Sequence, residues 1–339
     1  MWVIPLIEIK QAESLTGSKD AKSEFILISP PNLSPSPYVG PLSCNSAVKP
    51  RTIGGTWYPS VPPSSSQLSS KTLEKRHIIL HLHGGAYVVG SGRPDDCGFL
   101  ASVLLKHTPA SHIFIPQYRL ASQPGNIFPA ALQDAVTALF YLTHTLGYSL
   151  SEITLGGDSA GANLAMGLIR WVEKFGLESG LLVKNREDET FNAVFIMSLW
   201  ADPFTPVRNP GYLDDRTRRR TDYLHESFGA WGARGLGLFS ASSTDDILEW
   251  ERYLTFSGEE GPFKAKPRIW FEMGECEVMY DTQMSVWKAF EEVEGNRVGG
   301  MVQPAMPHDI LNVGEMLGLQ ANAVKLAKRV GVWMEAGNE

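Results

Sequence analysis

The sequence predicts an α/β fold, in which helices flank a mostly parallel central sheet. From Ile78 onward, short apolar runs alternate with segments whose apolar residues recur at helical spacing. The runs are continuously apolar, which is typical of strands that are covered on both faces. In addition, a glycine-rich turn at residues 156–161 joins one of these runs to a helical segment.

Eight strands are expected, two of them before the regular alternation begins. Residues 30–41 are rich in proline, and residues 59–70 contain three prolines and many serines, so both are expected to be loops. The predicted strands are Phe25–Ile28, Thr56–Tyr58, Ile78–Leu82, Ile113–Pro116, Ile153–Leu155, Ala193–Leu199, Ile269–Glu272 and Val298–Val302.

Helical spacing predicts helices at Pro129–Leu146, where Gly147 is the stop signal, after the glycine-rich turn, at Asp281–Val293 and at Met316–Met334. Residues 203–262 break the alternation, and we expect them to be an insertion that covers a site. Within them, the arginine-rich run at residues 216–220 is expected to be a solvated helix face. Three aromatic residues are candidates for an apolar pocket lining: Phe228, Trp231 and Phe239.

Composition places the chain among ordinary globular proteins. It has 339 residues, of which 43% are hydrophobic and 20% charged, and a formal charge of -7 gives no reason to expect nucleic acid as a partner. Three widely spaced cysteines suggest neither a disulfide framework nor a zinc site, and a reducing, cytoplasmic location is the simplest interpretation. The first nine residues do not resemble a secretory signal, and no apolar run is long enough for stable membrane insertion.

The glycine-rich turn is a good place for a nucleophile. Ser159 is at its apex, and a strained strand-to-helix turn requires small neighbours two residues away on each side, here Gly157 and Gly161. Such a turn also leaves the amide of Ala160 at a helix N-terminus, where it can face an anion.

A second motif, His-Gly-Gly-Ala at residues 83–86, directly follows the strand Ile78–Leu82. The backbone amides of Gly84 and Gly85 can turn toward an oxyanion, whose charge exists only in the transition state. The two motifs together indicate nucleophilic acyl chemistry more specifically than either does alone.

Further motifs make the chain resemble the hormone-sensitive-lipase-like branch of the α/β-hydrolases. Gly-Asp-Ser-Ala-Gly stands at 157–161, Tyr-Arg-Leu-Ala at 118–121 and Phe-Pro-Ala at 128–130, and Thr-Trp-Tyr-Pro at 56–59 is similar to fungal members. The resemblance covers about residues 50 to 335, with Ser122 in place of the usual proline. It implies an α/β-hydrolase core and a carboxylesterase that needs neither metal nor organic cofactor.

With this fold, residues 46–202 and 263–339 are expected to form the catalytic core. Residues 1–45 would form an N-terminal cap or lid, and residues 203–262 a cap insertion after the sixth strand. The expected partner is a small-molecule ester, and the sequence leaves a homodimer open.

A serine nucleophile needs a base and an acid, which follow it in the order acid and then histidine in this fold. His308 lies in a loop after the last predicted strand and is the candidate base. The resemblance assigns the acid to Glu277, in the segment Gly274–Asp281; Glu275, Asp281 and Asp202 remain alternatives. It also implies structural roles for His83, in the oxyanion loop, and for Asp158, beside the nucleophile.

The leading hypothesis is a serine esterase that acts on small to medium apolar esters. Two alternatives stay open: a lactonase, natural-product or sterol deacetylase or acyltransferase of fungal secondary metabolism, and a non-catalytic receptor for small molecules.

Overall fold

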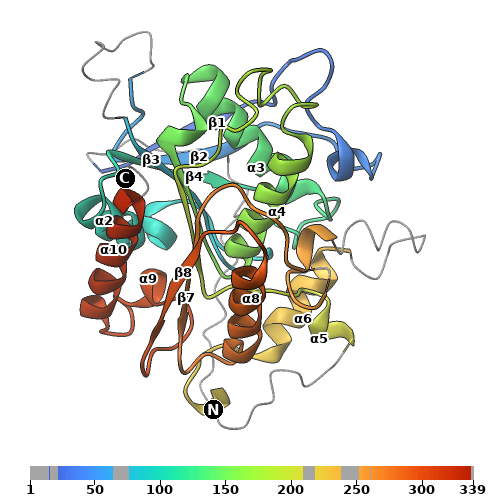
Figure 1. The fold of residues 1–339 in the computed structure, drawn as a ribbon. Coiled ribbons are helices and arrows are strands. Elements are labelled where there is room, and N and C mark those ends of the chain that lie inside the picture. The colour runs from blue at the N-terminus through green and yellow to red at the C-terminus, as the bar shows by residue number, and fades with distance from the viewer. Residues whose placement is uncertain are drawn as a thin grey trace.

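The computed structural model describes residues 15, 22–63, 76–208, 218–237, 252–259 and 261–336. Eight strands form one sheet in the order β1-β2-β4-β3-β5-β6-β7-β8 (Figure 1). The strands are β1 Glu24–Ile28, β2 Ile53–Tyr58, β3 Ile78–Leu82, β4 His112–Gln117, β5 Ile153–Asp158, β6 Ala193–Met197, β7 Ile269–Gly274 and β8 Val298–Gln303.

All eight predicted strands are present. The six from β3 onward are mutually parallel, whereas β2 runs antiparallel to both β1 and β4. Because they are parallel, β3, β5, β6, β7 and β8 all end at the same edge of the sheet. The loops that carry the predicted site residues therefore meet at this edge.

Helices cover both faces of the sheet (Figure 1). The α-helices are α2 Pro94–His107, α3 Ala130–Phe140, α4 Ala160–Phe175, α5 Thr205–Arg208, α6 Glu226–Gly235, α8 Tyr280–Glu292, α9 Ile310–Val313 and α10 Gln320–Glu335. Short 3₁₀ or π turns are η1 Gly40–Ser43, η3 Tyr141–Thr145, η4 Leu150–Glu152 and η5 Arg218–Arg220.

One helix was not predicted, and two predicted helices have other bounds. The unpredicted helix is α2, although Pro94 at its first turn and the acidic residues Asp95 and Asp96 are ordinary helix-start signals. The helix predicted from Met316 begins at Gln320, after a turn in which Gly318 has a φ of 72°. The helix predicted to reach residue 146 ends at 140 and continues as the single π turn η3.

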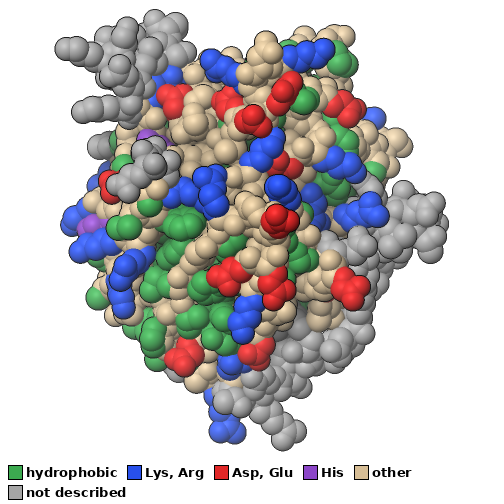
Figure 2. All heavy atoms as spheres, viewed as in Figure 1, with side chains coloured by type: hydrophobic (Ala, Val, Ile, Leu, Met, Phe, Trp, Pro, Cys, Tyr) green, Lys and Arg blue, Asp and Glu red, His purple; other side chains and the backbone are tan. Residues whose placement is uncertain are grey.

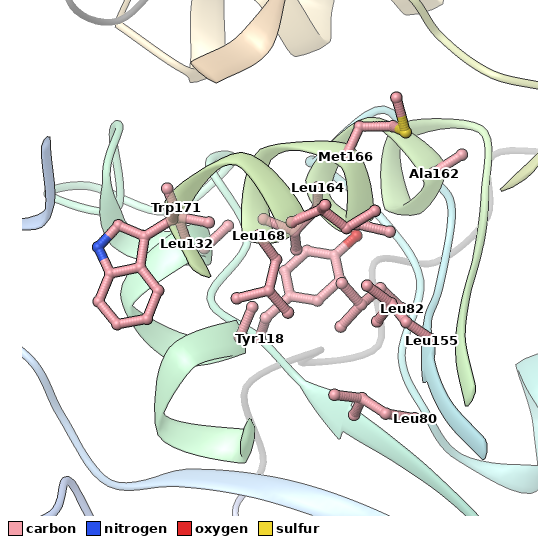
Figure 3. Close-up of a cluster of buried hydrophobic side chains, with 14 of the residues drawn as sticks. Leu80, Leu82, Tyr118, Leu132, Leu155, Ala162, Leu164, Met166, Leu168 and Trp171 are labelled. Carbon is pink, nitrogen blue, oxygen red and sulfur yellow. The ribbon is translucent and has the colours of Figure 1, made fainter. Parts of the chain in front are cut away.

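The core consists of two clusters, one on each face of the sheet. On β3, Ile78, Leu80 and Leu82 belong to the cluster under α3, α4 and α8, whereas Ile79 belongs to the cluster under α2, α9 and α10. This alternation follows from the two-residue period of a strand. Figure 3 shows Leu164 and Leu168 on the side of α4 that faces Leu82 and Leu155 of the strands, with Trp171 farther along the helix.

Of the predicted N-terminal cap, the structure describes residue 15 and residues 22–45. Residues 22–45 contribute β1 to the sheet and pack against α3 and α4. Tyr38 Oη and Thr137 Oγ1 are 2.7 Å apart, and the Trp171 indole donates to the carbonyl of Val39. A lid formed by residues 1–45 stays a prediction, and most of residues 1–21 lie outside the described part of the chain.

Strand β8 lies at the edge of the sheet opposite to β1 and is half-buried. Figure 2 shows hydrophobic side chains gathered over β7 and β8. Within the described ranges, no helix is both long and apolar enough to cross a membrane.

Candidate active site

Ser159 lies between β5 and α4 in a strained backbone conformation, with φ 53° and ψ -116°. There is no room for larger neighbours. A Cβ atom on Gly157 would lie 2.4 Å from the carbonyl oxygen of Gly161, and one on Gly161 would lie 1.9 Å from that of Leu82. The turn is thus the tight strand-to-helix connection that the motif predicts, and it places the serine at the carboxyl edge of the sheet.

The backbone on either side of Ser159 is fixed by neighbouring elements. Its amide donates to the carbonyl of Met197 at 2.9 Å, and its carbonyl accepts from the amide of Trp200 at 3.2 Å. Ala160 is the first residue of α4, and the first amides of a helix have no partner within the helix. Together with the helix dipole, they favour negative charge in front of Ser159.

The loop after β3 is held from both sides. The His83 Nδ1 atom is 2.8 Å from the carbonyl oxygen of Gly84, and the Tyr118 hydroxyl donates to the carbonyl of His83 at 2.6 Å. Since the carbonyl and the next amide of a trans peptide point in opposite directions, the first bond fixes the direction of the Gly85 N–H. Burial lowers the pKa of His83, so that a neutral imidazole makes this bond.

Close packing explains both glycines of this loop. A Cβ on Gly84 would lie 2.2 Å from a carboxylate oxygen of Asp158, and one on Gly85 would meet the carbonyl oxygen of Val89 at the same distance. Gly85 also has a φ of 105°, which disfavours any other residue. The loop is therefore rigid, as preorganised oxyanion donors need to be.

Glu277 and His308 are brought together, with 2.9 Å between the glutamate Oε2 and the imidazole Nδ1. The same oxygen accepts from the Gln283 side chain at 2.7 Å. The other, Oε1, accepts from the Ser198 hydroxyl at 2.8 Å and from the amide of Gly274 at 2.5 Å. A fully buried carboxylate with these donors has a fixed position and a stabilised charge.

The environment of His308 favours its charged form. Burial opposes the imidazolium, but the hydrogen bond and the charge of Glu277, followed by the charges of Asp222 and Asp158, raise the pKa of His308 above its usual value. Because Nδ1 faces Glu277, Nε2 is the nitrogen left to exchange a proton with a nucleophile.

No hydrogen bond joins the Ser159 hydroxyl to His308 among the bonds of the described residues, and their pairing stays a prediction. Such bonds are often long before the substrate binds. The two residues are nonetheless linked through β6: Met197 accepts the Ser159 amide, and Ser198 accepts the amide of Asp309, which follows His308.

The three alternative acids lie in other interactions. Glu275 accepts from the amide of Ala305, Asp281 pairs with Arg218 at 2.6 Å, and Asp202 accepts from Phe204 and Thr205 at the start of α5. Glu277 is therefore the candidate acid that contacts His308.

Two buried carboxyl groups lie behind Ser159. Asp158 Oδ1 is 2.7 Å from His81 Nε2, whereas Asp158 Oδ2 and Asp309 Oδ1 are buried without a hydrogen-bond partner among the described residues. Burial and the neighbouring charge of Asp158 raise the pKa of Asp309 far above its usual value. For Asp158, burial is outweighed by His81, and the pKa is lowered. Burial therefore favours the neutral form of the Asp309 carboxyl more than that of Asp158.

Sequence reasoning missed Ser198, Asp309 and Asp222, which contact the candidate triad or its loops. Ser198 lay inside a predicted strand, and its position after β6, with a φ of 49°, has no sequence signal. Asp309 adjoins the histidine motif and could have been noticed for that reason. Asp222 is in the insertion, 86 residues before His308, and no spacing rule connects the two.

A small pocket opens at Ser159 between the oxyanion loop and the insertion. Apolar side chains form most of its wall, and Phe228 is among them as predicted. Trp231 packs beside Phe228 with ring centroids 6.3 Å apart, and Phe239 lies outside the described residues. The pocket is lined by Ala86, Ser159, Trp200, Leu224, His225, Phe228, Gly229 and Met279.

Helix α6 packs closely onto this pocket. A Cβ on Gly232 would lie 2.3 Å from the carbonyl oxygen of Ala86 in the oxyanion loop and 2.9 Å from the Trp200 ring. The insertion therefore covers the site at short range, which limits the size of groups that fit beside Ser159. Within the described ranges, no cluster of three or more histidine, cysteine or acidic residues is arranged to hold a metal ion.

Comparison with known proteins agrees with this fold. A family model described as "alpha/beta hydrolase fold" matches residues 79–312. The chain is 34% identical to the esterase LipU of Mycobacterium tuberculosis, over 37% of this chain and 41% of that protein. It is 38% identical to an acetyl-hydrolase of Streptomyces hygroscopicus, over 27% of this chain and 29% of that protein. The matches thus span well under half the length of these relatives.

A crystal structure of an esterase/lipase from an uncultured bacterium is similar over 99% of this chain and 94% of that chain, with a TM-score of 0.66. At 19% sequence identity, this similarity shows a shared fold.

Proposed function

We propose that this chain, which belongs to the alpha/beta hydrolase fold family, is a carboxylesterase that works through an acyl-enzyme on Ser159. The observation that carries the proposal is the buried, hydrogen-bonded Glu277–His308 pair at the same sheet edge as a strained serine turn.

In the proposed mechanism, Ser159 attacks the ester carbonyl while His308 Nε2 takes its proton. Glu277 keeps the imidazole oriented and stabilises the imidazolium that forms. The imidazolium then protonates the departing alcohol. Water, activated by the same histidine, releases the acid from Ser159 and restores the enzyme.

The amides of Gly84, Gly85 and Ala160 are the proposed oxyanion donors. Their loops are fixed by His83, by Asp158 and by the start of α4, so little reorganisation accompanies the reaction. His83 and Asp158 therefore support the donors and take no part in proton transfer.

A short acyl group and an apolar alcohol fit the pocket best, because α6 closes on the oxyanion loop and Trp200, Phe228 and Met279 form the wall. The relative from Streptomyces hygroscopicus is named an acetyl-hydrolase, which favours the deacetylation of a small natural product over the lactonase and acyltransferase alternatives. A setting in fungal secondary metabolism stays a prediction, since the relatives reported above are bacterial.

The test compares the parent with Ser159→Ala on p-nitrophenyl esters of increasing acyl length, and Ser102→Ala, an exposed serine on α2, is the matched control. We expect the parent and the control to hydrolyse the acetyl ester fastest and Ser159→Ala to lose nearly all activity. Equal turnover by Ser159→Ala would refute the mechanism. A parent that neither hydrolyses esters nor reacts with a fluorophosphonate would instead support the small-molecule receptor.

A further inference from the structure

The inserted cap touches the candidate triad directly. Residues 218–223, here called the clasp, run from η5 to Tyr223 and precede the pocket residue Leu224. The clasp contacts the loop that holds Glu277: the Thr221 hydroxyl donates to the carbonyl of Cys276 at 3.3 Å, and Arg218 pairs with Asp281 and lies 4.6 Å from the Tyr280 ring.

Asp222 is the central residue of the clasp. Its Oδ2 accepts from the amide of Val278 at 2.9 Å, and its Oδ1 accepts from the amide of His308 at 3.3 Å. Val278 directly follows the candidate acid, and His308 is the candidate base. One carboxylate from the insertion therefore joins the two loops whose relative position sets the Glu277–His308 contact. The Tyr223 ring adds an edge contact to the imidazole, at 6.0 Å between centroids.

Asp222 also acts on His308 through its charge. Titratable groups from several elements surround the imidazole. They are Glu272 from β7, Glu277 from the loop after β7, Asp158 from β5, Asp222 and Tyr223 from the clasp, and the adjacent Asp309. Among these groups, the charge of Asp222 is the next contribution after Glu277 that raises the pKa of His308.

We propose that Asp222 is a positioning residue for the triad, so that the cap completes the catalytic geometry as well as covering the pocket. The inference rests on the proposed function. Seating of the clasp orders the acid loop and the histidine together, and a displaced clasp leaves Glu277 and His308 free to separate. Displacement of catalytic groups by about 1 Å can cost roughly 100-fold in rate.

Three variants test this proposal. Asp222→Ala removes both bonds to the catalytic loops, together with the bond that its Oδ1 accepts from the Tyr223 amide, whereas Asp222→Asn removes the charge and keeps one acceptor oxygen. Asp281→Asn is the matched control, since it also loses a carboxylate that holds the clasp, but its side chain is 77% exposed and touches neither catalytic loop amide.

We expect Asp222→Ala to lower kcat roughly 10- to 100-fold with a smaller change in KM. Asp222→Asn should show a smaller decrease in kcat. In both variants the acid limb of kcat/KM should move to lower pH, because removing a negative charge lowers the pKa of His308. Asp281→Asn should leave that limb in place.

An NMR titration of the His308 imidazole in the Ser159→Ala background measures the same pKa without any turnover. It keeps the two proposals distinguishable, because an inactive parent would refute the esterase, whereas the NMR titration still measures whether Asp222 acts on His308. If Asp222→Ala does not fold, the His308 titration of Asp222→Asn decides. Unchanged His308 titration together with unchanged kinetics in Asp222→Asn would overturn the proposal.

Discussion

Glu272 gives a quantitative prediction about stability. It lies in β7 with 1% of its surface exposed, and its Oε1 accepts from the Gln303 side chain at 2.6 Å. Its Oε2 is buried without a hydrogen-bond partner among the described residues. Burial, reinforced by the charge of Glu277, raises the pKa of Glu272 from 4.5 to about 8. The folded protein therefore holds this carboxyl neutral at pH 7.

The sign of the pH effect follows from proton binding. Between pH 4.5 and about 8, the folded state keeps a proton that the unfolded chain releases, so this group lowers the free energy of unfolding as pH rises through that window. At about 1.4 kcal/mol per pH unit, the loss by pH 7 is roughly 3 kcal/mol. Glu272→Gln stays neutral in both states and keeps the acceptor for Gln303, so it should escape this loss.

The assay is urea unfolding of the parent and Glu272→Gln at several values between pH 5 and pH 8. We expect the stability advantage of the variant to grow by about 1.4 kcal/mol per pH unit. Glu315→Gln, at an exposed glutamate, is the control and should follow the parent. Parallel curves for the parent and Glu272→Gln would refute the reasoning.

Three further predictions concern the nucleophile turn and its supports. Gly161→Ala forces a Cβ into the carbonyl edge of β3 and should lower the free energy of unfolding by about 3 kcal/mol, measured in urea. Ser198→Ala removes a donor from the buried Glu277 carboxylate and should lower kcat about tenfold at unchanged KM, in steady-state kinetics. Asp309→Asn removes a buried carboxyl whose pKa is raised by burial, so the parent should lose stability relative to this variant as pH rises, measured by urea unfolding at several pH values. A pH dependence that is the same with and without this substitution would contradict the raised pKa of Asp309.

The sequence predicted those parts of the fold that depend on local pattern. Short apolar runs located every strand of the described residues, and the glycines beside Ser159 were expected because the turn leaves no space for a side chain. The antiparallel pairing of β2 on both sides was not predictable, because strand order depends on contacts between segments far apart in sequence. Helix α2 was missed although its start signals are present and its buried residues Cys97, Leu100, Ala101 and Leu104 recur at helical spacing.

The candidate site likewise has parts that depend on local sequence pattern and parts that depend on contacts between distant segments. The serine turn and the oxyanion loop are short motifs, and their internal geometry follows from glycine positions alone. The contact between Glu277 and His308 agrees with the assignment that the family resemblance implied, whereas nothing in residue types or spacing indicated Ser198 or Asp222. Both act through backbone amides and a carboxylate that are distant in sequence, and such contacts have no sequence signature.

The position of β8 at the free edge of the sheet has a consequence for folding. The serine turn depends on β3, β5 and β6, which pair near the centre of the sheet, whereas the loop of His308 follows the outermost strand. Parallel strands joined by long connections pair slowly, because the chain must close a large loop before it gains their contacts. During refolding, we therefore expect the central strands to be buried first and the reactivity of Ser159 to return only when β8 has paired. Partly folded molecules would then have an unreactive serine.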